Sequence, residues 1–457
     1  MGAGKTTVGE EVARRLGRYF RDVDREIEDD LGMSIPQIFD QLGEAEFRQT
    51  EGRWTSDALE YNNEPTVIAL GGGAVTHPRT RELLRTRALT VWLDVDVETA
   101  WERAREGERP LAREETAFRR VYEERRPLYL DVADAVGTDA DDVVLAAAGV
   151  RVEIGALEFL GRLVPGDGSI ALVTDPHVGG IHGAAAQLAL GDRLASTHEV
   201  PAGEEAKTTG VLERLWRELR VDRSGMLVAL GGGCVTDVSG FAAAAYLRGI
   251  PWVAVPTTLV GQVDAAIGGK TAIDLPEGKN LVGAFHWPVS TVIDPALLQT
   301  LPERERRDGM AEVVKTGLLA GEPFWDLPQA ELVRRCAAFK AAVCLRDPND
   351  RGERAMLNLG HTFAHALEAA SSYEGVTHGT AVALGLRAAL RLSGRETNVV
   401  DDLLAPEPVR VDRDRAWRAL GRDKKRGLVL LRDDGPRWDV QLPDDEVRRA
   451  LDELIAD

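Results

Sequence analysis

Residues 226–250 read MLVALGGGCVTDVSGFAAAAYLRGI, and this stretch decides the fold that the sequence predicts. It begins with an apolar run typical of a buried strand, passes through three glycines and continues as a helix of small residues. Another apolar strand, SIALVTDP at 169–176, precedes it. Alternating strands and helices predict a parallel sheet with a dinucleotide-type site at the carboxyl ends of its strands. The G-x-G-x-x-G fingerprint is missing here, so the spacing alone is weak evidence for NAD.

The strand-and-glycine pattern occurs a second time, because VIALGGGAV at 67–75 matches LVALGGGCV at 227–235. The similarity ends with the strand, whereas an internal repeat extends over about 20–50 residues. We therefore expect two independent α/β units within the 457 residues, a length that suits two or three domains.

Composition argues against several classes of protein. A formal net charge of −19 disfavours nucleic-acid binding, and it means that local clusters of lysine and arginine must hold any anionic substrate. No stretch has the ~18 apolar residues of a membrane span, and no signal peptide is recognisable. The three cysteines, Cys234, Cys336 and Cys344, show no metal-type spacing, so we expect a reduced, cytoplasmic protein.

The chain opens with MGAGKTTVGEEVARRLG at 1–17, where GKT at 4–6 completes the second half of a phosphate-binding loop, G-x-x-x-x-G-K-[ST]. Helical spacing follows, and a helix start places backbone N–H groups and a positive dipole end against a phosphate. Asp22 and Asp24 come after a short apolar stretch, and on a strand end they would lie on the same side. A plain glycine turn and a solvated Asp-x-Asp loop are the alternative interpretations.

From Met1 to about Asp134 the chain resembles shikimate kinase, because GAGKTT, YFRDVDREIE, GMSIPQIFDQLGEAEFRQTE, LGGGAV, ERPLA and ERRPLYLDVAD follow one another in that order. The resemblance implies ATP-dependent phosphorylation of shikimate with Mg²⁺, which requires positioning and positive charge. ATP and the metal would be bound by Gly2, Gly4, Lys5, Thr6, Thr7 and Asp22. The substrate would be bound by Asp24, Arg48, Gly72, Gly73 and Arg125. Asp24 would orient the attacking hydroxyl, and Arg109 would neutralise the transferring phosphoryl group.

The resemblance also places a central strand ahead of the loop, whose first glycine would fall two residues before Met1. Without that strand, two neighbours keep unpaired backbone groups, each costing about 1–3 kcal/mol when buried, against a total stability of about 5–15 kcal/mol. Because the downstream motifs are intact, we expect that the start codon is assigned too late. The alternative is a degraded domain that now serves as a structural or interaction module.

The second half contains a more specific stretch, VPTTLVGQVDAAIGGKTAIDLPEGKNLVGAFHWP at 255–288. Its glycine-rich polar composition suits an anionic phosphate, with Asp264, Lys270, Lys279 and Asn280 as the polar side chains.

Histidines and a glutamate further along suggest a metal site. Glu312 stands near Lys315 in the helical segment GMAEVVKTGLL, and His361 and His365 share one helix face at i and i+4. His378 follows in THGTAVALG. One glutamate with two histidines is a catalytic zinc set that leaves coordination positions open. A buried core histidine is the alternative for His361 alone.

From about Arg151 onward the chain resembles 3-dehydroquinate synthase, which converts a seven-carbon keto acid phosphate (DAHP) to 3-dehydroquinate with catalytic NAD⁺ and one divalent metal, Zn²⁺ or Co²⁺. The resemblance implies metal binding by Glu312, His361 and His378, with His365 handling protons. Substrate would be surrounded by Lys270, Lys279, Asn280, Lys315, Lys340, Arg354 and Asn358, by Lys424 and Lys425, and by Arg248 from a neighbouring subunit of a homodimer. NAD would be bound by Asp175, Glu204, Lys207, Gly232, Gly233, Asp237, Thr257, Thr258 and Lys279, with Asp264 near the nicotinamide.

Three positions depart from the synthase pattern: His177 replaces an asparagine, and Thr380 and Asp350 each replace a glutamate. Thr380 removes a carboxylate two residues after a metal ligand, which would weaken the support of the zinc. None of the three is a proposed ligand, so we expect activity to survive with altered affinity.

The sequence thus predicts a P-loop kinase domain at 1–145, an NAD-binding α/β domain at 151–305 and an α-helical metal and substrate domain at 306–457. The substrates would be small molecules rather than nucleic acid or membrane. A glycerol-type dehydrogenase is the rival class, since it shares NAD, a metal and this plan. It has no use, however, for a phosphate-binding cluster of Lys270, Lys279, Asn280 and Arg354.

Overall fold

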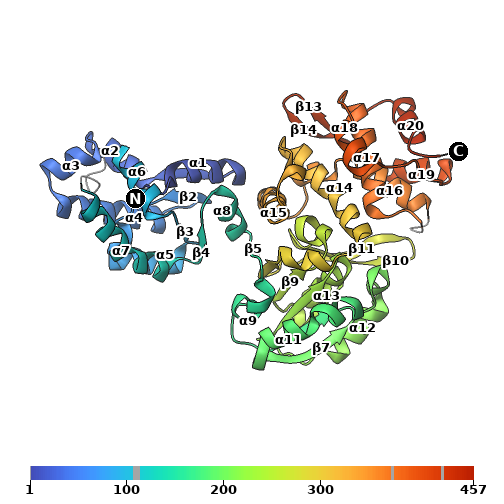
Figure 1. Ribbon diagram of the computed structural model, residues 1–457, viewed down its shortest axis with the longest axis horizontal. Helices are drawn as coiled ribbons and strands as arrows, with labels where there is room; N and C mark the ends of the chain where they lie inside the picture. The colour runs from blue at the N-terminus through green and yellow to red at the C-terminus, as the bar shows by residue number, and fades with distance from the viewer. Residues whose placement is uncertain (1, 107–113, 372–374, 424–426, 457) are drawn as a thin grey trace. The chain divides into compact units, whose positions relative to one another are not determined.

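The computed structural model describes residues 2–106, 114–371, 375–423 and 427–456. They form two compact units, Met1–Ala147 and Ala148–Asp457 (Figure 1). Among these residues, no helix is both long and apolar enough to cross a bilayer.

The first unit consists of helices packed around short strands. Its elements are α1 (Lys5–Leu16), β1 (Tyr19–Asp22), α2 (Val23–Leu31), α3 (Ile35–Gln41), α4 (Glu44–Glu60), β2 (Thr66–Ala69), η1 (Ala74–Thr76), α5 (Pro78–Arg87), β3 (Val91–Leu93), α6 (Val97–Glu106), α7 (Glu115–Val132), β4 (Ala135–Gly137) and α8 (Ala140–Ala147). Helix α1 follows the predicted spacing, because it buries Val12, Ala13 and Leu16 and is flanked by the left-handed glycines Gly4 and Gly17.

The prediction that Asp22 and Asp24 lie on one side of a strand is wrong. Strand β1 ends at Asp22, whose carboxylate accepts hydrogen bonds from the backbone N–H groups of Asp24 and Arg25. This contact is a helix N-cap, so the chain turns into α2 at Val23 and Asp24 lies on the first helical turn.

The strands of the first unit form two separate parallel pairs, β1 with β2 and β3 with β4. A cavity of about 510 Å³ has both β2 and β3 in its lining. Within the described residues neither β2 nor β3 has a second strand partner, as the missing central strand leads one to expect.

The second unit is built on a six-stranded parallel sheet in the order β5-β12-β9-β8-β6-β7. Its elements up to the end of the sheet are β5 (Val150–Val152), η3 (Ala156–Phe159), α9 (Leu160–Leu163), β6 (Ile170–Thr174), α10 (Pro176–Val178), η4 (Gly179–Gly183), α11 (Ala184–Leu190), η5 (Gly191–Arg193), β7 (Leu194–Glu199), η6 (Gly203–Ala206), α12 (Thr209–Glu218), β8 (Met226–Gly231), α13 (Gly233–Ala245), η7 (Tyr246–Arg248), β9 (Trp252–Pro256), η8 (Gly261–Ala265), β10 (Lys270–Leu275), β11 (Gly278–Phe285) and β12 (Ser290–Ile293). Every residue of β6, β8 and β9 is buried, so the prediction of a parallel sheet from two apolar runs is confirmed.

Helices dominate the remainder of this unit (Figure 1). They are η9 (Pro295–Thr300), α14 (Glu303–Ala320), η10 (Phe324–Asp326), α15 (Gln329–Arg346), η11 (Glu353–Asn358), α16 (His361–Ala370), α17 (His378–Leu392), α18 (Asn398–Leu404), α19 (Arg413–Asp423) and α20 (Asp444–Asp452), with the hairpin β13 (Leu428–Arg432) and β14 (Gly435–Val440). Their apolar faces share one core, which includes Val314, Phe363 and Leu384. The predicted fold class, α/β with a helical domain toward the carboxyl end, is confirmed.

Candidate active sites

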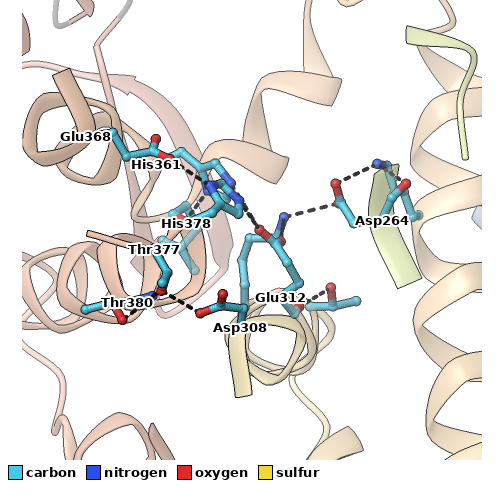
Figure 2. A network of polar contacts seen from close by, with 12 residues as sticks. Asp264, Asp308, Glu312, His361, Glu368, Thr377, His378 and Thr380 are labelled. Atoms are coloured by element: carbon cyan, nitrogen blue, oxygen red, sulfur yellow. Dashed lines mark hydrogen bonds and ion pairs between the residues drawn. The ribbon is translucent and has the colours of Figure 1, made fainter. Parts of the chain in front are cut away.

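Three helices of the second unit bring the predicted metal ligands together. Nε2 of His378 lies 3.1 Å from Oε1 of Glu312, and Nε2 of His361 lies 3.3 Å from the same oxygen (Figure 2). One ligand atom from each residue falls within 4.8 Å of the others. Both histidines are the first residues of their helices, α16 after the left-handed Gly360 and α17 after the cap residue Thr377. This placement fixes their backbones at helix starts and directs both rings toward α14.

The buried charges around Glu312 alternate in sign. Lys315, one turn further along α14, forms ion pairs with Glu312 and, at 3.3 Å, with Asp264. Burial opposes the ionisation of Glu312, but the charge of Lys315 outweighs it and holds the pKa of Glu312 well below its usual value. Asp264 also receives Lys340, whose Nζ lies 3.0 Å from Oδ2, and its pKa falls to about 2 because the two lysines overcome its burial. At neutral pH the row therefore consists of ionised partners.

Glu368 is a polar partner of the cluster that the sequence analysis missed. Its Oε1 lies 3.3 Å from Nδ1 of His378, on the ring edge opposite Glu312. Burial opposes the charged form of His378, but hydrogen bonds to both glutamates raise the pKa of its imidazole to about 10. Glu368 follows His361 by seven residues, two helical turns, so the i, i+4, i+7 pattern of a single face could have revealed it.

Thr380, which replaces an expected glutamate, belongs to a hydrogen-bonded helix start. Thr377 Oγ1 accepts from the Thr380 N–H at 3.2 Å, and the Thr377 hydroxyl donates to Oδ1 of Asp308 at 2.6 Å (Figure 2). The contact joins the start of α17 to α14, the helix that carries Glu312. The carboxylate beside His378 thus comes from Glu368 rather than from position 380.

The predicted phosphate-binding cluster divides into two groups. In the β10–β11 hairpin Lys270 is opposite Phe285, whereas Leu275 is opposite Gly278 near the turn. Lys270 therefore lies at one end, and Lys279 and Asn280 at the other, about 13 Å away along the strand. The sequence could not show this separation, because a hairpin of six-residue strands holds its two ends apart.

The first group surrounds Lys270. Its Nζ lies 2.6 Å from Oδ2 of Asp350, one of the three departures, and burial lowers its pKa. Arg354 is fully buried, donates from Nη1 to the Gly268 carbonyl at 3.0 Å and lies over the ring of Phe285. Asn358 ends the same turn, η11, and is exposed.

The second group joins predicted NAD residues to predicted substrate residues. Lys207 Nζ donates to Oδ2 of Asp237 at 2.7 Å and also to the side-chain oxygen of Asn280. Lys279 Nζ donates to Oε1 of Glu204 at 2.8 Å. Burial opposes the charge of Lys207, but Asp237 and Glu204 outweigh it and raise its pKa.

The sheet reverses its winding between β6 and β8, where open α/β sheets bind nucleotides. Asp175 follows β6 and caps α10 through the N–H groups of His177 and Val178. Gly232 and Gly233 follow β8 and begin α13, and Thr258 Oγ1 accepts from the Gly261 N–H. Further predicted residues take the following places: Thr257 is buried at the end of β9, Arg248 is exposed with φ 71°, and His365 is exposed with its ring 5.6 Å from that of His361. Lys424 and Lys425 lie outside the described residues.

In the first unit the phosphate-loop and metal residues meet at the start of α1. Gly2 and Gly4 have φ values of 68° and 74°, and Lys5, Thr6 and Thr7 form the first turn. The Thr6 hydroxyl donates to Oδ2 of Asp22 at 2.6 Å, which joins the two residues expected to hold Mg²⁺. Arg109 lies outside the described residues.

The residues expected to bind shikimate lie around the glycine turn that follows β2. Arg48 Nη1 donates to Oε2 of Glu51 at 2.6 Å, and a Cβ at Gly73 would stand 1.8 Å from that same nitrogen. Gly73 therefore leaves room for the arginine. The Gly72 carbonyl accepts from Arg125 Nη1 at 3.1 Å.

Glu51 is a second residue that the sequence analysis missed. Burial raises the pKa of its carboxyl, and a Cβ at Gly71 would fall 2.1 Å from its Oε1 and 2.6 Å from Oδ1 of Asp24. Asp24 and Glu51 thus approach the same point of the turn. Its i+3 spacing from Arg48 was the available signal.

Comparison with known proteins assigns each unit. Residues 1–150 match the family model of shikimate kinase, residues 197–308 that of the N-terminal part of 3-dehydroquinate synthase, and residues 309–407 that of its C-terminal part. The 3-dehydroquinate synthase of Latilactobacillus sakei is 42% identical over 274 residues, which is 56% of this chain and 77% of the relative.

Two further similarities cover more of the chain. Among solved structures, 2-epi-5-epi-valiolone synthase from Streptomyces hygroscopicus, with NAD⁺ and Zn²⁺ bound, is 26% identical with a TM-score of 0.57, covering 67% of this chain and 96% of that one. The bifunctional shikimate kinase/3-dehydroquinate synthase of Thermotoga maritima is 34% identical over 414 residues, covering 84% of this chain and 82% of the relative. The predicted pairing of families is confirmed: the chain belongs to the bifunctional shikimate kinase/3-dehydroquinate synthase family.

Proposed function

We propose that the second unit converts DAHP to 3-dehydroquinate and phosphate, and that the first phosphorylates shikimate with ATP. The cluster of Glu312, His361 and His378 beside the Lys315–Asp264 pair carries the first assignment. It combines a cation site with buried groups of fixed charge.

The cluster fits a divalent metal of the zinc type. Two imidazoles and one carboxylate are the N and O ligands that Zn²⁺ and Co²⁺ accept, and a three-residue set leaves positions for substrate oxygens. When bound, the metal would polarise the substrate hydroxyl and stabilise its alkoxide. The Nδ1 atom of His361 lies 3.2 Å from the Leu359 carbonyl, so a proton held there leaves Nε2 to face the site.

The remaining polar groups would hold substrate and cofactor. Lys270, Arg354, Lys340, Asn358 and the exposed His365 would contact the phosphate and carboxylate, with Asp350 positioning Lys270. The switch point between β6 and β8 would bind NAD, with Lys207, Asp237 and Glu204 at its edge. Since Asn280 contacts Lys207, the hairpin would connect the cofactor to the substrate.

In the first unit Lys5 and the N–H groups of α1 would hold the ATP phosphates, while Thr6 and Asp22 would bind Mg²⁺. Arg48 and Arg125 would pair with the shikimate carboxylate, and Asp24 would orient the hydroxyl that attacks.

The domain limits, location and assembly are parts of the same proposal. We assign residues 1–145 to the kinase, 151–305 to NAD binding and 306–457 to metal and substrate binding. The protein would act in the cytoplasm as a homodimer through its synthase half, with Arg248 reaching the partner's site. The exposed left-handed turn at Leu247 and Arg248 suits a residue presented to a neighbour.

Two assays on one preparation of the 457-residue chain test the two activities. Phosphate release from DAHP should require NAD⁺ and should stop after removal of the metal with a chelator, and Zn²⁺ or Co²⁺ should restore it. Shikimate-dependent ADP release should accompany it. A synthase without phosphate release contradicts the first assignment, and absence of ADP release beside a working synthase contradicts the second.

The Glu368→Gln variant should bind metal about 10–100-fold more weakly than wild type, because the amide is a poorer acceptor for the Nδ1–H of His378. Chelator competition measures this affinity directly. Glu396→Gln, an exposed glutamate of the same unit, is the matched control. Equal affinities for the two variants would show that Glu368 does not support the ligand.

A further inference from the structure

A slot in the first unit has the dimensions and lining of a missing β-strand. The cavity of about 510 Å³ touches all of β2 and β3, so it lies between the two strand pairs. It extends from Ala3 and Lys5 at the phosphate loop to Arg18 and Leu89. The four residues of β2 rise about 13 Å at the usual 3.3 Å per residue. A single strand of similar length would therefore follow the slot.

Both faces of the slot are apolar. Helix α1 contributes Val8, Val12 and Leu16, and Phe118, Tyr129 and Val132 come from α7. Side chains of a strand alternate between two faces, so an occupant needs apolar residues at every position. A polar or alternating peptide would bury unmatched polar groups there.

The two strands that border the slot are less buried than their position in an α/β unit requires. Three of the four residues of β2, and all three of β3, are partly exposed. In the second unit every residue of the central strand β8 is buried between two neighbours. The difference arises because β2 and β3 each present one backbone edge and part of both faces to the slot.

The elements around the slot also set the direction of an occupant. Asp22 at the end of β1 contacts Thr6, and the chain after β2 runs into Gly71, so the carboxyl ends of both strands lie at the loop. Strand, glycine loop and helix follow one another in a P-loop unit. An occupant that continues through Gly2 and Gly4 into α1 would thus run parallel to β1 and β2.

We propose that the slot receives one further β-strand of about four apolar residues, which pairs in parallel with β2 and β3 and continues directly into the Gly2–Gly4 turn. With it the two strand pairs become one five-stranded sheet. The proposal rests on the slot alone and not on the kinase activity.

The test extends the full chain ahead of Met1 by a strand and the start of the loop, Val-Ile-Val-Leu-Gly-Phe. A control of equal length, Val-Pro-Asp-Leu-Gly-Phe, cannot donate at its proline and places a charge in the slot. Hydrogen exchange is measured by mass spectrometry on peptides that cover 66–69 and 91–93, with β6 and β8 as internal references.

We expect exchange in both β2 and β3 to slow at least tenfold in the apolar extension, and to stay at the level of the unextended chain in the control. Unchanged exchange, or slowing in one of the two strands alone, would overturn the proposal. ADP release is measured separately. Slower exchange without turnover would leave the strand site established and count against the proposed kinase function.

Discussion

Replacing Glu312 with glutamine should remove tightly bound metal and lower the kcat/KM of the synthase by about 10³-fold or more. Glu312 is the carboxylate shared by both histidines, with 3.1 and 3.3 Å contacts, and it is almost completely buried. Glutamine keeps the shape but removes the negative charge that attracts a divalent ion. A metal that stabilises a developing alkoxide is worth several kcal/mol, and about 4 kcal/mol corresponds to 10³ in rate.

Metal content and synthase turnover are measured together on the same preparation. Glu305→Gln, an exposed glutamate on the same helix α14, controls for the substitution itself. Shikimate-dependent ADP release controls for overall folding, because it belongs to the other unit. Wild-type metal stoichiometry with wild-type turnover in Glu312→Gln would exclude this residue as a ligand.

Local sequence patterns predicted the elements that carry the site. The apolar runs at β6 and β8 and the helical spacing of α1, α14 and α16 all report a neighbour relation within one element. The ligand set followed from residue types that are scarce in the chain, since His361 and His378 are two of eight histidines. In such cases the chemistry of the side chain and its place on a helix carry the same information.

Relations between elements were beyond the reach of spacing. Lys270 and Lys279 are nine residues apart, yet a hairpin sends them to opposite ends of two strands. Asp22 and Asp24 resembled a strand pair until the Asp22 carboxylate capped the next helix. Glu368 acts on His378 from a neighbouring helix, so its contact depends on how α16 and α17 pack. Each case depends on a tertiary contact or on competition between two local structures.

Replacing Lys315 with methionine should lower the free energy of unfolding of the synthase unit by about 3–5 kcal/mol at pH 7. Lys315 is buried and pairs with Glu312 and Asp264. Methionine fills similar space, so the loss arises from two buried carboxylates that keep fewer compensating charges. Urea unfolding followed by hydrogen exchange in β6 and β8 reports on this unit alone. Arg391→Met breaks an exposed pair with Glu453 and should cost at most about 1 kcal/mol.

The pH dependence of this loss identifies its electrostatic origin. In the wild type the pKa of Asp264 is about 2, below the ordinary 3.8, because Lys315 and Lys340 outweigh burial. Its ionised form therefore stabilises the fold above pH 3.8, and this contribution is lost as the pH falls through about 2. Without Lys315, burial raises the folded-state pKa of Asp264, so the variant's deficit should shrink between pH 7 and pH 4. Adding Asp264→Asn should recover part of the loss, as expected for residues in contact. A deficit that is independent of pH and strictly additive with Asp264→Asn would instead assign Lys315 a packing role, because methionine and lysine differ in shape as well as in charge.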